Sequence, residues 1–129
     1  MNSGSPTHQI AMIEPLWTDF RRAGCLPCRE FPVHGMYRGY LDLLVQTPTG
    51  KLAIEAELSA GRITAALLKA SAVGADELWI VTPTRKIANA IRLRLEKLKR
   101  GLPGTPCLIL TLPQAQRHIA RRWQTKKER

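Results

Sequence analysis

The sequence predicts an α/β fold in which helices flank a mixed β-sheet, and three observations lead to that prediction. Two apolar runs, GYLDLLVQ and KLAIEAEL, are separated by the turn-forming segment TPTG, which is typical of a β-hairpin. After the hairpin, segments with helical periodicity alternate with short apolar runs, which is typical of strands joined by helical crossovers. The chain has 129 residues, of which 44% are hydrophobic, and this suffices for the core of a single domain.

The segments before the hairpin are expected to form a helix and a short strand. Apolar residues recur at helical spacing over residues 7–23. Within that helix, Pro15 must cause a kink or start a second helix, because it lacks an N–H donor. Residues 28–34 are expected to form a strand, and Pro32 points to an edge position in the sheet.

The segments after the hairpin alternate between helix and strand. We expect helices over residues 62–73, 85–100 and 114–124, and strands over residues 77–84 and 107–112. The element order is therefore αβββαβαβα, within one domain that spans residues 1–124. The basic tail at residues 125–129 is expected to be disordered.

The sequence has no features of a membrane-spanning or secreted chain. No segment approaches the run of about 20 apolar residues that a membrane span needs. The N-terminus MNSGSPTHQI has neither a basic start nor an apolar run, so we expect a cytoplasmic protein. Cys25, Cys28 and Cys107 are then expected to be reduced thiols. Cys25 and Cys28 have zinc-ligand spacing, but a structural zinc needs four ligands, so we favour plain thiols unless the fold adds Cys107 and His34.

The charge is distributed unevenly along the chain, whose net charge is +10. Residues 1–60 carry five basic and six acidic side chains, a net charge of −1. Residues 61–129 carry fifteen basic and four acidic side chains, a net charge of +11. So basic a half suits a polyanion such as nucleic acid, although a solvated basic surface used in an assembly would have the same composition.

The basic side chains of the second half are candidates for contacts with DNA phosphates. Such contacts give affinity without sequence information. The candidates are Arg62, Arg85, Lys86, Arg92, Arg94, Lys97, Lys99, Arg100, Arg117, Arg121, Arg122, Lys126 and Lys127.

Three acidic residues are expected to converge on one face of the hairpin. If the turn centres between Pro48 and Thr49, Asp42 faces Glu55 across the strands, and Glu57 shares their face because side chains alternate. Carboxylates placed in this way repel one another, and a divalent cation removes that cost. Mg²⁺ is usually held by one or two carboxylates. The alternative is an edge strand guarded by charges against aggregation.

This hairpin resembles that of the PD-(D/E)xK nuclease superfamily. The resemblance rests on GYLDLLV followed by KLAIEAEL, on a helix that carries Lys69, and on the strand ADELWIVTP. It implies a restriction endonuclease-like three-layer sandwich and Mg²⁺- or Mn²⁺-dependent cleavage of DNA. By the same resemblance, Asp42 and Glu55 are the metal ligands, and Glu57 occupies the position of the family's lysine.

The glutamate at position 57 leaves several roles open. Some members of the superfamily carry Glu there, and the acid then serves in metal binding or as a general base. Others supply the amine from the following helix, where Lys69 or Arg62 is placed to do so. A site that has decayed into a DNA-binding module is the third reading. Glu14 could be an additional acid of the site or an exposed helix residue.

The expected function is therefore a Mg²⁺-dependent endodeoxyribonuclease, with Asp42, Glu55, Glu57 and Lys69 as catalytic residues. No recognition module is apparent, so the enzyme is expected to be structure-specific, non-specific or directed by a partner, and a homodimer would let it cut two strands. One rival is an inactive nuclease-fold DNA-binding protein of a mobile-element or repair complex. Another is an assembly protein of a ribonucleoprotein particle.

Overall fold

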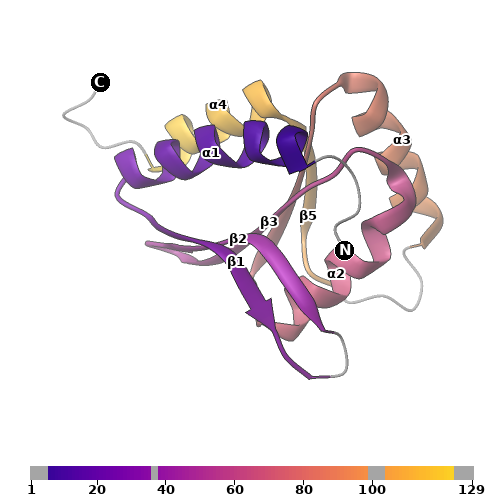
Figure 1. The fold of residues 1–129 in the computed structure, drawn as a ribbon, viewed down its shortest axis with the longest axis horizontal. Coiled ribbons are helices and arrows are strands. Elements are labelled where there is room, and N and C mark those ends of the chain that lie inside the picture. Colours follow the sequence, from indigo (N-terminus) through magenta and orange to yellow (C-terminus); the bar gives the residue numbers. More distant parts are fainter. Residues whose placement is uncertain (1–5, 36–37, 99–103, 124–129) are drawn as a thin grey trace.

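The computed structural model describes residues 6–35, 38–98 and 104–123, and these residues form an α/β fold (Figure 1). The described part contains a five-stranded mixed sheet and four α-helices, as the sequence predicts. In chain order the elements are α1 (Pro6–Arg22), β1 (Leu26–Val33), β2 (Gly39–Thr47), β3 (Gly50–Ala56), the short 3-10 helix η1 (Ala60–Arg62), α2 (Ile63–Ala72), β4 (Glu77–Thr82), α3 (Arg85–Leu98), β5 (Cys107–Thr111) and α4 (Leu112–Trp123). The predicted tail, residues 125–129, lies outside the described residues.

The strands lie in the order β1-β2-β3-β4-β5, so neighbours in the sheet are also neighbours in the chain. The first three strands are antiparallel, whereas β3, β4 and β5 are parallel and are connected by α2 and α3. β1 is an edge strand, as Pro32 indicates. Pro15 lies inside α1, which continues to Arg22, so it does not start a second helix.

Helices cover both faces of the sheet. α1 and α4 pack side by side on one face, and α2 and α3 lie on the other (Figure 1). Trp79 is fully buried under α1 and α4, where its ring lies 5.9 Å from that of Phe20. Ile80, the next residue of β4, is buried under α2 and α3. The apolar run of β4 therefore reflects burial on both faces, as in other parallel sheets. No helix of the described residues is long and apolar enough to cross a membrane.

The β2–β3 hairpin has the predicted register. Leu44 pairs with Ala53 and Gln46 with Lys51, which centres the turn between Pro48 and Thr49. Gly50, after the turn, has a φ of 146°, and a Cβ atom there would collide with the carboxylate of Asp76. That carboxylate accepts a hydrogen bond from the Lys51 N–H at 2.9 Å, so the close approach holds the hairpin against β4.

The alternation of side chains between the two faces of the sheet is interrupted near the middle of the β1–β2 hairpin. Leu43 belongs to the core under α1, but Leu41 belongs to the core under α2, although residues two apart normally share a face. The change occurs where Glu30 lies opposite Asp42. Glu30 has a φ of 48°, which is uncommon for a residue other than glycine, and the described ladder skips this one pair. Asp42 therefore lies at the bend of its strand.

Candidate active site

The carboxylates of Asp42 and Glu55 each accept a hydrogen bond from the backbone of the facing strand at the point where the β2–β3 ladder ends. The last pair of the described ladder joins Leu43 to Ile54. Beyond it, the Asp42 N–H donates to Glu55 Oε1 at 3.1 Å, and the Ala56 N–H donates to Asp42 Oδ2 at 2.7 Å. The two carboxylates thus replace the backbone acceptors of a continued ladder, and this fixes both side chains close to one another.

Lys69 brings a positive charge from α2 to this pair. Its Nζ atom donates to Glu55 Oε2 at 2.8 Å and to the carbonyl oxygen of Tyr40 at 2.9 Å. The side chains of Lys69 and Glu55 are only 12% and 5% exposed, so this ion pair is largely shielded from water. The amine that the sequence places on the following helix therefore reaches the acids.

All three acids interact, and burial makes their ionisation costly. Burial raises the pKa of Glu55 to about 7; Asp42 adds to this effect and Lys69 opposes it. Burial also raises the pKa of Glu57 to about 7, against the attraction of Arg62. The pKa of Asp42 is raised for the same reason, although the Ala56 N–H and Lys69 favour its ionised form. At neutral pH the cluster therefore favours any additional positive charge.

Glu57→Gln is expected to stabilise the protein at high pH in the absence of divalent metal. The raised pKa of Glu57 means that the folded state holds the proton more tightly than the unfolded state does. The contribution to stability is therefore present below the usual pKa of 4.5 and is lost as pH rises through about 7. Urea unfolding should show the variant more stable by ~1–3 kcal/mol at pH 8, with the difference vanishing near pH 4.

Glu14→Gln is the matched control for this experiment. Glu14 lies on the exposed surface of α1, where its carboxylate is 2.7 Å from the Arg29 guanidinium. Loss of this surface ion pair should change stability by at most about 1 kcal/mol, and in the destabilising direction. A Glu57→Gln variant that behaved like this control would show that burial does not raise the pKa of Glu57. The ion pair also places Glu14 on the surface of the α1–α4 layer, as the alternative reading of this residue predicts.

The residues present fit a hard divalent cation in donor type. Asp42 and Glu55 offer carboxylate oxygens, and each oxygen can accept a metal in addition to its hydrogen bond because it has two lone pairs. Two carboxylates are enough for Mg²⁺, which fills the remaining positions with water and substrate. Among the residues that the structure describes, no three His, Cys, Asp or Glu side chains form a closed ligand group. The cysteines are free thiols, with Cys25 buried and Cys28 exposed.

Only some of the predicted DNA contacts lie near the acids. Arg62 in η1 attracts the carboxylates of Glu57 and Asp42 and is itself exposed. Arg85 and Lys86 are exposed at the start of α3, a helix that packs against η1. Arg62 thus borders the acids, and the helix that carries Arg85 and Lys86 lies next to η1. Arg94 and Lys97 are exposed further along α3, whereas Lys99 and Arg100 lie outside the described residues.

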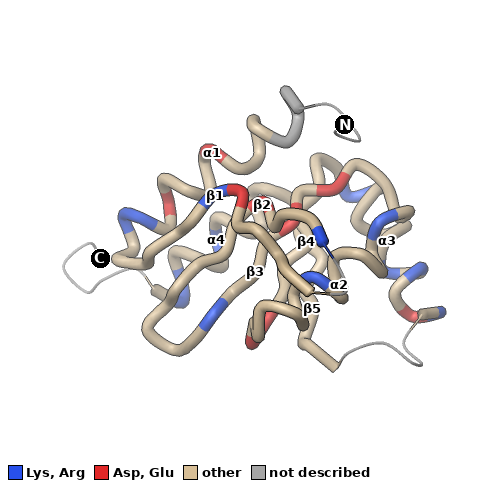
Figure 2. The backbone as a smooth tube through the Cα atoms, turned by 60° about the horizontal axis from the view of Figure 1, so that its bottom comes forward, with Lys and Arg blue, Asp and Glu red and all other residues tan. Residues whose placement is uncertain are grey.

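Other basic candidates have internal partners or lie in the opposite layer. Figure 2 shows basic positions on α3 and also on α4, which is packed with α1 against the other face of the sheet. Arg92 donates to the carbonyl oxygen of Ile109 in β5 at 2.8 Å. Arg122 makes two hydrogen bonds to Glu77, of 2.7 and 3.1 Å. Arg121 is exposed on α4. The sequence alone could not separate these structural arginines from those that border the acids.

Glu30 is a residue of the site that the sequence pattern did not reveal. The β1–β2 register places it opposite Asp42, and its charge contributes to the raised pKa of that residue. Its strained backbone is of the kind that clusters at functional sites. The sequence gives no sign of this neighbour, because the connection between β1 and β2 does not fix their register as the shorter turn of the next hairpin does.

Comparisons of the chain with models of protein families, with curated proteins and with solved structures found no match. The α/β architecture and the geometry of the acids are therefore findings of the structure. Membership of the PD-(D/E)xK superfamily and the restriction endonuclease-like fold stay predictions from the sequence.

Proposed function

We propose that this protein is a Mg²⁺-dependent endodeoxyribonuclease of the restriction endonuclease-like type. The observation that carries the proposal is the pair of half-buried Asp42 and buried Glu55, with the amine of Lys69 2.8 Å from Glu55, at the end of a hairpin ladder. Acids that repel one another lower the stability of the folded state, so their presence in this cluster favours a functional role. Carboxylates with perturbed pKa values of this kind cluster at catalytic sites.

Each residue of the cluster has a role that follows from its surroundings. Asp42 and Glu55 would hold the ion. When bound, Mg²⁺ or Mn²⁺ lowers the pKa of a water molecule and neutralises charge on a phosphodiester. Glu57 has a pKa of about 7, which suits a general base that takes a proton from the attacking water. Lys69 is placed to offset negative charge that develops on the phosphate.

The charge of the protein supports a nucleic acid as the substrate. The second half of the chain carries a net charge of +11, and Arg62 borders the acids. Contacts of this kind bind the phosphate backbone and read no sequence. The proposed enzyme is therefore structure-specific, non-specific or directed by a partner. A homodimer would provide the second site that is needed to cut both strands of a duplex.

A second candidate is a nuclease-fold DNA-binding protein without activity. One observation favours it: Lys69 already neutralises Glu55, so this acid is satisfied in the folded chain without an ion. In that case the acids would have no catalytic role, and Arg62 and the other exposed basic side chains would bind DNA without cleaving it.

The proposal predicts metal-dependent cleavage of DNA by the wild-type protein. Supercoiled plasmid incubated with Mg²⁺ or Mn²⁺ should be nicked and linearised. EDTA should stop the reaction. Salt-sensitive binding without any cleavage of plasmid or branched DNA would support the second candidate. RNA-selective binding that survives loss of all three acids would instead point to an assembly protein.

A further inference from the structure

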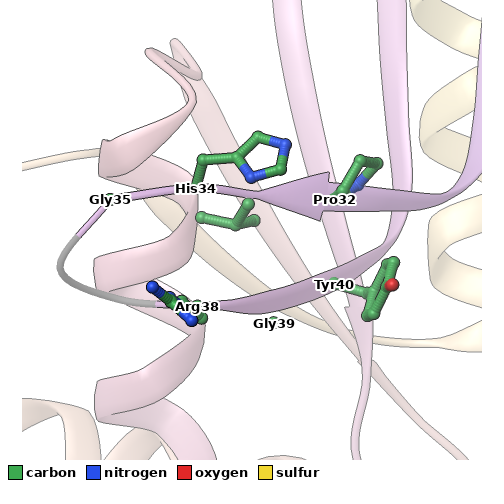
Figure 3. Close-up of a pocket in the computed structure, with 7 residues that line it drawn as sticks. Pro32, His34, Gly35, Arg38, Gly39 and Tyr40 are labelled. Atoms are coloured by element: carbon green, nitrogen blue, oxygen red, sulfur yellow. The ribbon is translucent and has the colours of Figure 1, made fainter.

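The distal end of the β1–β2 hairpin carries a pocket with a volume of about 430 Å³. Pro32 and His34 line it from β1 and the residues that follow, and Arg38 and Tyr40 line it from the opposite side (Figure 3). The hairpin extends past the other strands at the bottom of Figure 1, so the pocket lies on a projecting part of the molecule. It is separate from the carboxylate cluster described above.

The four side chains share one face of the hairpin. Pro32 pairs directly with Tyr40, and continuing the same register places His34 opposite Arg38. Val33, between Pro32 and His34, and Leu41, next to Tyr40, are buried in the core under α2, so the four side chains point away from that helix. Tyr40 is 61% exposed, which is uncommon for so large a ring on a strand that borders the core.

The chemistry of this face matches that of a single nucleotide. The ring of Tyr40 offers a flat surface on which any base can stack. Its cross-strand neighbour Pro32 adds a rigid apolar wall that loses no rotamer freedom on binding. The Arg38 guanidinium is a fork of donors that suits a phosphate, and the His34 imidazole adds a further N–H donor.

The pocket is joined to the carboxylate cluster by Lys69. Its Nζ atom bridges the carbonyl oxygen of Tyr40 and Glu55 Oε2. A Cβ atom added at Gly39 would lie 3.5 Å from Lys69 Cδ, so the backbone of β2 at Gly39 packs directly on the Lys69 side chain. Tyr40 is also two residues from Asp42 in the same strand. The four side chains and the Lys69–Glu55 pair thus lie on opposite faces of the same hairpin and are connected through the backbone of Tyr40.

We propose that the face formed by Pro32, His34, Arg38 and Tyr40 is a subsite for one unpaired nucleotide of DNA. Tyr40 stacks on the base, and Arg38 binds the adjoining phosphate. A paired base is held in its duplex stack and cannot lie flat on Tyr40, so the subsite selects DNA with a flap, gap or single-stranded branch. The proposal does not depend on the proposed nuclease function, because the binding itself needs no metal.

The test measures binding in EDTA, by fluorescence anisotropy, to a flapped duplex and to a fully paired duplex of the same length. Tyr40→Ala should weaken binding to the flapped DNA by about 10-fold, Tyr40→Phe should retain it, and affinity for the paired duplex should stay within about twofold. A 2-aminopurine base in the flap should be quenched by the wild type and by Tyr40→Phe but not by Tyr40→Ala. Arg38→Ala should lower the salt dependence of binding by about one phosphate contact.

Two variants serve as matched controls. Leu26 is 65% exposed at the other end of the same strand pair, so Leu26→Ala removes a similar exposed apolar surface. Arg22→Ala removes one exposed positive charge at the end of α1. The subsite is refuted if Tyr40→Ala binds flapped DNA like Leu26→Ala, if both DNAs lose affinity equally, or if the loss appears with RNA and not with DNA. Tyr40-dependent binding without cleavage in Mg²⁺ would refute the nuclease function and leave the subsite standing, whereas cleavage with no effect of Tyr40 would do the reverse.

Discussion

Asp42→Asn is expected to lower the rate of DNA cleavage by at least about 1,000-fold, equivalent to ~4 kcal/mol in the activation barrier. The asparagine keeps an oxygen that can accept the hydrogen bond from the Ala56 N–H, so the local fold should persist. What the variant loses is a negative charge that would hold the ion. Removing that charge also relieves its repulsion of Glu55, so the metal-free variant should be at least as stable as the wild type. Plasmid cleavage in Mg²⁺, together with a thermal unfolding curve, measures both effects.

Asp76→Asn is a matched control for this variant. Asp76 also accepts a backbone hydrogen bond, from the Lys51 N–H at 2.9 Å, but at the exposed turn end of the same hairpin. It should cut DNA at the wild-type rate. Calorimetric titration with Mn²⁺ should detect binding to the wild type and to Asp76→Asn but not to Asp42→Asn. If Asp42→Asn cut as fast as the wild type, the assignment of the acids as the catalytic centre would be wrong.

Lys69→Met is expected to have the largest effect on stability of any change in the site. Methionine keeps the length of the side chain, but it leaves the buried carboxylate of Glu55 and the carbonyl oxygen of Tyr40 without their shared donor. Breaking a buried ion pair by removing one partner should cost about 3 kcal/mol at pH 8. Lys69 stabilises the ionised form of Glu55, so its contribution is present above the pKa of about 7 and is lost as pH falls through it. Urea unfolding at pH 8 and pH 5 should show this decrease.

The double variant Lys69→Met with Glu55→Gln separates the ion pair from packing. It removes both charges, and replacing a buried pair by neutral groups often costs little, so stability at pH 8 should recover most of the loss. Lys51→Met is the surface control; its amine contacts only the carbonyl oxygen of Val73, at 3.5 Å, among the described residues, and its removal should change stability by less than about 0.5 kcal/mol. A double variant as unstable as Lys69→Met would show that the lysine acts through packing and not through charge.

Most of the fold could be predicted from the sequence, because local patterns decide it. Short-range periodicity distinguishes strand from helix, and the observed elements end within a few residues of the predicted bounds. The two-residue turn at Pro48 and Thr49 determines the register of β2 and β3, so the proximity of Asp42 and Glu55 could be anticipated from the sequence as well. Lys69 could be proposed as a partner from its place on the next helix, although its reach could not.

By itself the sequence determined the α/β class, the order of the elements, the hairpin register and the uneven distribution of charge. These properties depend on periods and turns that span a few residues. The tertiary structure decided that Lys69 reaches Glu55, that Glu30 lies opposite Asp42, and that the hairpin bends between them. It also decided that Arg122 of α4 binds Glu77 of β4, whereas Arg62 borders the acids. These contacts join residues far apart in the chain, and their geometry depends on how the layers pack, which no local pattern encodes.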